Sequence, residues 1–367
     1  MLVVLAIILS FFSSFTLSFV PTTGTLQLQR PAAIITGRLL SSSNPPNSNT
    51  NYELPELPAI PNNLPPLTKE YYSGVYSLVK EIYTSYPPGS LSRIIEWISN
   101  GVYSSSTPGV VDDVILDDGY VETSEDLPGL ERRKWWDDRQ KLQWVEGLES
   151  RSEDIIQEFA SVAKEGKTLW STSDRASREV MGPGWSSLRL MRHGNWLTST
   201  GITGEIFERT RRAVTESGAP LSVRNVLFAR QAGGGQGIRE HTDGRNFILT
   251  AHLGVKVPST KTGECESDQL YLSVGGERRR WEEGKCLVFS TSYLHSTWND
   301  SDNDRVVLLV DFWHPDVTEV EREFLRRVYE MKREFRERDS KRGEEEEEED
   351  NVQERLNNNF FNFFAKR

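Results

Sequence analysis

The sequence predicts a mainly β protein with helices on both sides of a β-rich central region. Six short runs with β-branched and aromatic residues lie between residues 185 and 312, separated by turns rich in Gly or Asp. Several short strands at this spacing are typical of a sandwich, a jelly roll or a barrel. The expected strands are Trp185–Met191, Leu221–Ala229, Phe247–Val257, Gln269–Val274, Lys285–Ser290 and Arg305–Phe312.

Apolar residues recur at helical spacing outside these strands. We expect helices over Lys69–Tyr86, Ser90–Asn100, about 131–165, Gly204–Glu216 and Val320–Arg338, with a loop-like stretch from Ser104 to Pro128. The chain is therefore divided into a helical region at 67–165, a β domain at 166–318, a C-terminal helix at 319–342 and an acidic tail at 343–367, which is expected to be disordered.

The first 66 residues are expected to lie outside the fold. Leu2–Val20 has no charged residue, which is typical of a signal peptide, here 1–18. An uncleaved signal anchor is the alternative, and it is the only membrane contact we expect. Residues 19–66 have the composition of a transit peptide followed by a Pro-rich linker. Entry into the secretory pathway is therefore expected. The junction Ser18-Phe19-Val20-Pro21 resembles bipartite plastid presequences, so a plastid destination stays open.

Net charge and cysteine content argue against some classes of protein. The formal net charge is -11, and the run Glu344–Asp350 is entirely acidic. A negative field argues against a nucleic-acid partner. Two cysteines, Cys265 and Cys286, are too few for a disulfide framework or a zinc cluster, and either one bridge or two free thiols is compatible with the sequence.

The histidines give the first indication of chemistry, because all five lie in or beside the β-rich region. In His241-Thr-Asp243, an imidazole and a carboxylate two residues apart would point to one side of a strand. An imidazole from a neighbouring strand would complete a 2-His-1-carboxylate metal site. A second His-x-Asp, at His314, cannot begin such a site because no histidine follows it. We expect His314 and His193 to be structural. The five are His193, His241, His252, His295 and His314.

The distal part of the β-rich region contains a candidate arginine, Arg305, for binding an anionic ligand. His295 and Arg305 are expected on the two strands of one hairpin, joined by an Asp-rich turn at Asp300–Asp304. Arg305 begins an otherwise apolar run, where a guanidinium needs an anionic partner, and a bidentate carboxylate is the best one. A dicarboxylate cosubstrate beside the metal would supply it. The alternative is a surface arginine paired with Asp304.

The stretch from His241 to Pro315 resembles the aspartyl/asparaginyl β-hydroxylase family of iron(II)- and 2-oxoglutarate-dependent dioxygenases. The resemblance implies a double-stranded β-helix that uses Fe(II), 2-oxoglutarate and O2 to hydroxylate an unactivated C–H bond. It implies iron ligands at His241 and His295, an anchor for the distal carboxylate of 2-oxoglutarate at Arg305, and His252 near the other carboxylate. The implied substrate is Asp or Asn in a peptide, or the acyl chain of a lipid. The residues that carry the resemblance are His241, His252-Leu-Gly254, Trp281-Glu-Glu-Gly-Lys285, His295, Trp298, Arg305 and Asp311-Phe-Trp-His-Pro315.

Two positions depart from the animal peptide hydroxylases of this family, which have Gly in place of Asp243 and Arg in place of Thr250. Asp243 is therefore either a third iron ligand or a residue that shapes the turn at Gly244. Thr250 motivates the alternative of a non-catalytic metal-binding module, and a cupin-like enzyme that uses iron without 2-oxoglutarate is a third possibility. The candidates for the missing cation are Arg230, Arg239 and Arg245.

Overall fold

A computed structural model describes most of the chain between residues 57 and 339. The described residues are 57–339 apart from 61, 63, 65, 88, 104–113, 124, 167–169, 173–177, 198–205 and 260–268. The expected signal peptide, the transit peptide with most of the linker, and the acidic tail lie outside them. Cys265 also lies outside, and the thiol of Cys286 is buried and free.

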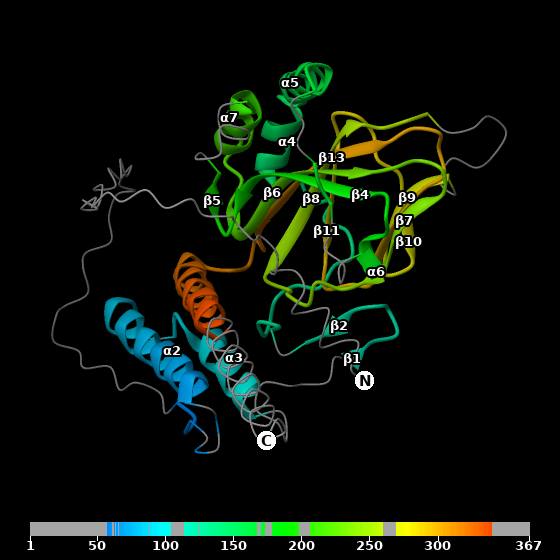
Figure 1. The fold of residues 1–367 in the computed structure, drawn as a ribbon. Helices are drawn as coiled ribbons and strands as arrows, with labels where there is room; N and C mark the ends of the chain where they lie inside the picture. Colours follow the sequence, from blue (N-terminus) through cyan, green and yellow to red (C-terminus); the bar gives the residue numbers. More distant parts are fainter. Residues whose placement is uncertain are drawn as a thin grey trace, which may run out of the picture.

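Eight consecutive strands form two antiparallel sheets that enclose an apolar cluster (Figure 1). The order in the larger sheet is β11-β8-β13-β6, and the order in the smaller sheet is β10-β9-β12-β7. This is the topology of a jelly roll or double-stranded β-helix, and it confirms the expected fold. The strands are β6 Leu221–Gln231, β7 Gln236–His241, β8 Ile248–Lys256, β9 Leu270–Val274, β10 Glu277–Arg279, β11 Cys286–Ser290, β12 His295–Asn299 and β13 Arg305–Trp313.

Further short elements extend this core. β4 pairs with β6 and lengthens the larger sheet, and both β3 and β5 pair with β4. A separate two-stranded ribbon, β1 with β2, lies within the stretch that the sequence indicated as a loop. The elements are β1 Val114–Ile115, β2 Val121–Glu122, β3 Ser171–Thr172, α6 Arg178–Met181, β4 Trp185–Arg192, β5 Asn195–Trp196 and α7 Glu208–Glu216.

The expected hairpin of His295 and Arg305 is wrong. β12 pairs with β7 and β9 in the smaller sheet, whereas β13 lies between β8 and β6 in the larger one. The reason is burial. All but one residue of β13 are buried, as in a central strand covered on both faces, whereas burial in β12 alternates. The Asp-rich turn therefore crosses from one sheet to the other.

The single helix expected over 131–165 is also wrong. Only α4, Gln143–Glu149, and α5, Ser152–Lys164, are helical. The residues before them run along the edge of β11, because the Trp136 N–H donates to the Val288 carbonyl at 2.8 Å and Trp135 bridges to Phe289. Figure 1 shows α4, α5 and α7 gathered over the larger sheet, whose outer face they cover.

Three helices form a second layer at the other end of the sheets. α2, Pro66–Ser85, and α3, Ser92–Tyr103, pack with a helix over 319–339 around a shared apolar cluster (Figure 1). These are the first two expected helices and the C-terminal one. Within the described residues, none of the helices combines the length and the apolar character needed to cross a bilayer.

His314 supports the fold as a neutral, buried imidazole. It is 1% exposed, its Nε2–H donates to the Glu131 carbonyl at 3.0 Å, and its Nδ1 accepts the Asp316 N–H at 3.1 Å. Burial lowers its pKa. Below about pH 6.5 the unfolded chain therefore takes up a proton that the folded chain resists, and stability falls with falling pH.

We expect His314→Asn to reduce this acid sensitivity. The residue should account for up to about 1.4 kcal/mol of unfolding free energy per pH unit below the unfolded pKa. Urea unfolding of both proteins near pH 7 and pH 5 measures the difference. All other titrating groups are shared, so equal pH dependence in the two proteins would contradict the role given to His314.

Candidate metal and cosubstrate site

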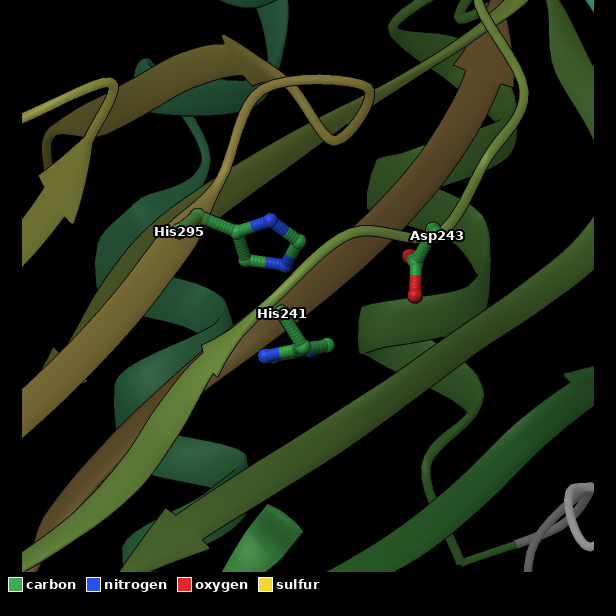
Figure 2. A group of neighbouring side chains, drawn as sticks. All are labelled: His241, Asp243 and His295. Atoms are coloured by element: carbon green, nitrogen blue, oxygen red, sulfur yellow. The ribbon is translucent and has the colours of Figure 1, made fainter. Parts of the chain in front are cut away.

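The pairing of β7 with β12 brings two histidines together. His241 ends β7, His295 begins β12, and the two residues are directly paired across the strands. Their ring centroids lie 4.2 Å apart. Figure 2 shows both imidazoles beside each other, with Asp243 on the segment that follows His241. The second imidazole thus comes from a neighbouring strand, as expected.

Backbone hydrogen bonds fix the tautomer of both rings. The Nδ1 atom of His241 lies 2.8 Å from the Arg239 carbonyl, and that of His295 lies 2.9 Å from the Tyr293 carbonyl. A carbonyl only accepts, so each Nδ1 carries a proton, and in the neutral imidazole Nε2 is then the atom with the lone pair. Burial, with a smaller effect of His241, lowers the pKa of His295 to about 4. His295 is therefore neutral at pH 7, the form that binds metals.

Asp243 completes a three-residue group. One ligand atom from each of His241, Asp243 and His295 lies within 4.8 Å of the other two. Burial alone would raise the pKa of Asp243, but the Arg224 guanidinium, whose Nη1 donates to Oδ2 at 2.7 Å, outweighs it and holds the pKa below its usual range. The carboxylate is therefore ionised, as a hard metal ligand must be.

The turn after His241 is held by Thr242. Its hydroxyl accepts the Gly244 N–H at 3.2 Å and donates to the Thr291 carbonyl at 3.1 Å. Gly244 itself takes a left-handed φ of 65°, which suits glycine. The side chain of Asp243 instead points to Arg224. The side-chain hydrogen bonds of the turn are therefore made by Thr242, and the Asp243 carboxylate binds Arg224.

Arg224 is the cation that the sequence reasoning missed. Besides pairing with Asp243, its Nε lies 3.8 Å from Oδ2 of Asp311, whose Oδ1 accepts the Thr250 hydroxyl at 2.7 Å. The polar position at Thr250 is therefore satisfied within this cluster. A charged residue in the largely buried strand β6 was the available signal, the same signal that singled out Arg305.

The three candidate arginines serve elsewhere in the described structure. Arg230 pairs with Asp304 at 3.6 Å, and Arg245 pairs with Glu125 at 2.7 Å. Arg239 is exposed and contributes its backbone carbonyl to His241. None of the three hydrogen-bonds Asp243 among the described residues, so the expectation that one of them supplies the missing cation is replaced by Arg224.

Arg305 is a buried cation that forms no ion pair with any described residue. It is 2% exposed, its guanidinium lies 4.3 Å from the centroid of the Trp281 ring, and its Nε has no hydrogen-bond partner. The alternative pairing with Asp304 is not formed, and that carboxylate lies 3.6 Å from Arg230. Burial lowers the pKa of Arg305 to about 9, so it stays charged at neutral pH. An unpaired buried charge is costly, and a ligand carboxylate would relieve that cost.

A row of rings connects Arg305 with the histidine pair. The Trp281 ring stacks against His252 with centroids 6.2 Å apart, and its Nε1–H donates to His252 Nδ1 at 3.4 Å. Phe289 lies between His252 and His295, at 5.0 and 5.8 Å. Because Nδ1 accepts, the proton of His252 is on Nε2. Burial, then Arg305 and His295, hold the pKa of His252 well below its usual value.

The sequence that forms this site is similar to a known protein family. Residues 149–315 match the model of the aspartyl/asparaginyl β-hydroxylase family. The aspartate β-hydroxylase domain-containing protein 2 of Rattus norvegicus is 42% identical over 91 residues, which is 24% of this chain and 24% of that protein. The aspartyl/asparaginyl β-hydroxylase of Mus musculus is 29% identical over 203 residues, which is 54% of this chain and 25% of that protein.

One bacterial relative is named for a lipid substrate. The ornithine lipid ester-linked acyl 2-hydroxylase of Rhizobium tropici is 38% identical over 81 residues, 22% of this chain and 27% of that protein. The chain therefore spans about a quarter of the length of these relatives. Among solved structures, a prolyl hydroxylase from Trichoplax adhaerens is similar with a TM-score of 0.32 and 15% identity, over 45% of this chain and 79% of that one.

Proposed function

We propose, from the premise that residues 149–315 belong to the aspartyl/asparaginyl β-hydroxylase family, that the chain is an iron(II)- and 2-oxoglutarate-dependent dioxygenase. One observation carries the proposal. One ligand atom from each of two imidazoles and one ionised carboxylate lies within 4.8 Å of the other two, and a row of rings leads from them to a buried Arg305 that has no ion pair among the described residues.

Each residue has a role in this proposal. His241, Asp243 and His295 hold Fe(II), and three protein ligands leave positions for other molecules. Arg305 holds the distal carboxylate of 2-oxoglutarate, and the Nε2–H of His252 faces the carboxylate nearer the metal. With metal, 2-oxoglutarate and O2 bound, the reaction releases succinate and CO2 and places one oxygen atom in a C–H bond of the substrate. Trp281 and Phe289 keep water from the site.

The β-carbon of Asp or Asn in a peptide is the proposed target. A match over 203 residues, 54% of this chain, is with an aspartyl/asparaginyl β-hydroxylase. The shorter match with an acyl 2-hydroxylase supports the second candidate, hydroxylation of a lipid acyl chain. Candidate peptides with Asp or Asn and candidate acyl lipids should therefore be tested side by side.

The alternative of a non-catalytic metal-binding module rested on Thr250. The hydrogen bond from Thr250 to Asp311, together with Arg224 as the nearby cation, weakens that motive. The cupin-like alternative uses iron without 2-oxoglutarate, and it supplies no anionic partner for the buried guanidinium of Arg305. Both alternatives predict that the chain does not consume 2-oxoglutarate.

The direct test is turnover of 2-oxoglutarate by the purified chain with Fe(II), ascorbate, O2 and the candidate substrates. Succinate should form together with a substrate that is heavier by one oxygen atom, as measured by mass spectrometry. His295→Ala should bind iron poorly and form neither product, whereas His193→Asn, at a turn residue with a φ of 51° that Asn tolerates, should act like wild type. Absence of both iron and 2-oxoglutarate binding in the wild type would refute the proposal.

We also propose that residues 1–66 direct the chain into the secretory pathway and from there to a plastid. The uncharged apolar start and the following stretch without acidic residues up to Tyr52 support this. A fluorescent protein fused behind residues 1–51 tests it. Label confined to the secretory pathway would remove the plastid step, and label retained in a membrane would favour the signal anchor.

A further inference from the structure

A second buried donor without a partner lies beside Arg305. Gln231, the last residue of β6, is directly paired with Arg305 of β13. Side chains at such a pair lie on the same face, with Cβ atoms about 4.5–5.5 Å apart. Gln231 is 0% exposed and Arg305 is 2% exposed. Gln231 Nε2 and Arg305 Nε are both buried and lack a hydrogen-bond partner in the described part of the chain.

The hydroxyl of Thr297 hydrogen-bonds the oxygen end of the Gln231 amide. Its oxygen accepts the Ile238 N–H at 3.2 Å, and its single proton is donated to Gln231 Oε1 at 3.5 Å. The amide oxygen is therefore occupied and the Nε2–H group is not. Thr297 belongs to β12, two residues after His295, so the Gln231 side chain points between the sheets toward the strand of the histidine pair.

The chemistry of the missing acceptor follows from the two donors. Arg305 is a cation with a planar donor edge, and Gln231 adds a neutral N–H next to it. A carboxylate has two oxygens and four acceptor sites, so a single carboxylate can accept from both side chains. A neutral oxygen would leave the guanidinium charge uncompensated in a buried position.

We propose that Gln231 is a specificity-determining residue that donates from Nε2 to the distal carboxylate of the cosubstrate, beside Arg305. This rests on the proposed function. The pair of donors favours a dicarboxylic 2-oxo acid over a monocarboxylic one of equal length. Arg305 supplies the charge, and Gln231 supplies a directed hydrogen bond that an apolar chain end does not use.

The test compares two ligands on two proteins. The dissociation constants of 2-oxoglutarate and of 2-oxopentanoate, which has a methyl group in place of the distal carboxylate, are measured by anaerobic calorimetry on the Fe(II)-loaded chain, with displacement of 2-oxoglutarate for the weaker ligand. Gln231→Met should weaken 2-oxoglutarate roughly 10- to 100-fold and leave 2-oxopentanoate unchanged. Gln231→Glu should exclude 2-oxoglutarate more strongly, because the new carboxylate competes for Arg305.

The controls separate the possible failures. Gln157→Met, the same change on the exposed surface of α5, should bind both acids like wild type. Unchanged 2-oxoglutarate binding by Gln231→Met, or an equal loss of both acids by a variant with wild-type thermal stability, would overturn the role of Gln231. A wild type that binds Fe(II) but not 2-oxoglutarate would instead refute the proposed function.

Discussion

Arg305→Met should lower the affinity of the Fe(II)-loaded protein for 2-oxoglutarate by at least roughly 30-fold without changing its affinity for iron. Truncating one partner of a buried, hydrogen-bonded charge pair costs about 2–5 kcal/mol, and the orphaned charge would here be the ligand carboxylate. Methionine keeps an apolar contact with the Trp281 ring, over which the guanidinium lies at 4.3 Å. Anaerobic calorimetry with Fe(II) and then 2-oxoglutarate separates the two affinities.

Arg230→Met is the matched control for this result. Arg230 lies opposite Val306 in the same pair of strands, but it is half-exposed and pairs with Asp304. It should bind 2-oxoglutarate like wild type. Arg305→Lys should fall between wild type and Arg305→Met, because lysine keeps the charge and loses the planar donor edge. If Arg305→Met binds 2-oxoglutarate normally and the enzyme remains active, the cupin-like alternative is the better account.

The same substitution has an opposite expected effect on the ligand-free protein. Burial lowers the pKa of Arg305 to about 9, which means that its environment disfavours the charge. Replacing buried charged groups by apolar ones of similar volume is often stabilising by about 1–4 kcal/mol. Arg305→Met should therefore unfold at a higher urea concentration than wild type in the absence of ligand. Such a gain in stability together with a loss of binding indicates that the residue is kept for function.

The strands that could be predicted from sequence are the ones buried on both faces. β8 and β13 are apolar along nearly their whole length, so their composition alone indicates them. β7 and β12, which carry the histidine pair, are polar and partly exposed. Their histidines were found through spacing and family resemblance. Composition does not specify which strands pair, and for this reason the predicted hairpin of β12 and β13 is wrong.

Arg224 and Gln231 were missed for a different reason. Each is a polar residue within β6, and neither belongs to a local motif. The role of Arg224 depends on its ion pair with Asp243, 19 residues away in the chain. The role of Gln231 depends on its pairing with Arg305 on the neighbouring strand. The register between two strands cannot be read from a single sequence. The region before α4 was misjudged on the same ground, because its helical spacing competes with a backbone hydrogen bond to Val288 that only the folded sheet provides.

The polar cluster around Asp243 accounts for Asp243 and Thr250 together, the two positions at which the family resemblance implies other residues. An added carboxylate at Asp243 and a lost arginine at Thr250 would both make the site more negative. Arg224 offsets this, since it pairs with Asp243 at 2.7 Å and lies near Asp311, which Thr250 holds. Burial opposes the charge of Arg224, but Asp243 and Asp311 outweigh it and raise the pKa of Arg224. Oδ2 of Asp243 is thereby engaged, and a carboxylate has a second oxygen with which it could hold a metal.

Asp243→Gly should weaken Fe(II) binding by at least about 10- to 100-fold. Outer partners of metal ligands are typically worth about 10- to 100-fold in affinity, and a direct ligand should contribute at least as much. The two histidines remain in this variant, so iron binding is weakened, not abolished. Anaerobic titration of the metal-free protein with Fe(II), followed by calorimetry, measures the effect.

Two further variants make this result specific to the carboxylate. Asp243→Asn keeps the size of the side chain and an oxygen that accepts from Arg224, so the fold is preserved while the ligand charge is lost, and it too should bind iron weakly. Asp316→Gly removes the aspartate of the other His-x-Asp pair, whose imidazole is already occupied by Glu131 and Asp316 backbone groups. It should bind iron like wild type. If Asp243→Gly and Asp243→Asn match wild type while His295→Ala does not, iron is held by two histidines alone, and Asp243 serves only to pair with Arg224.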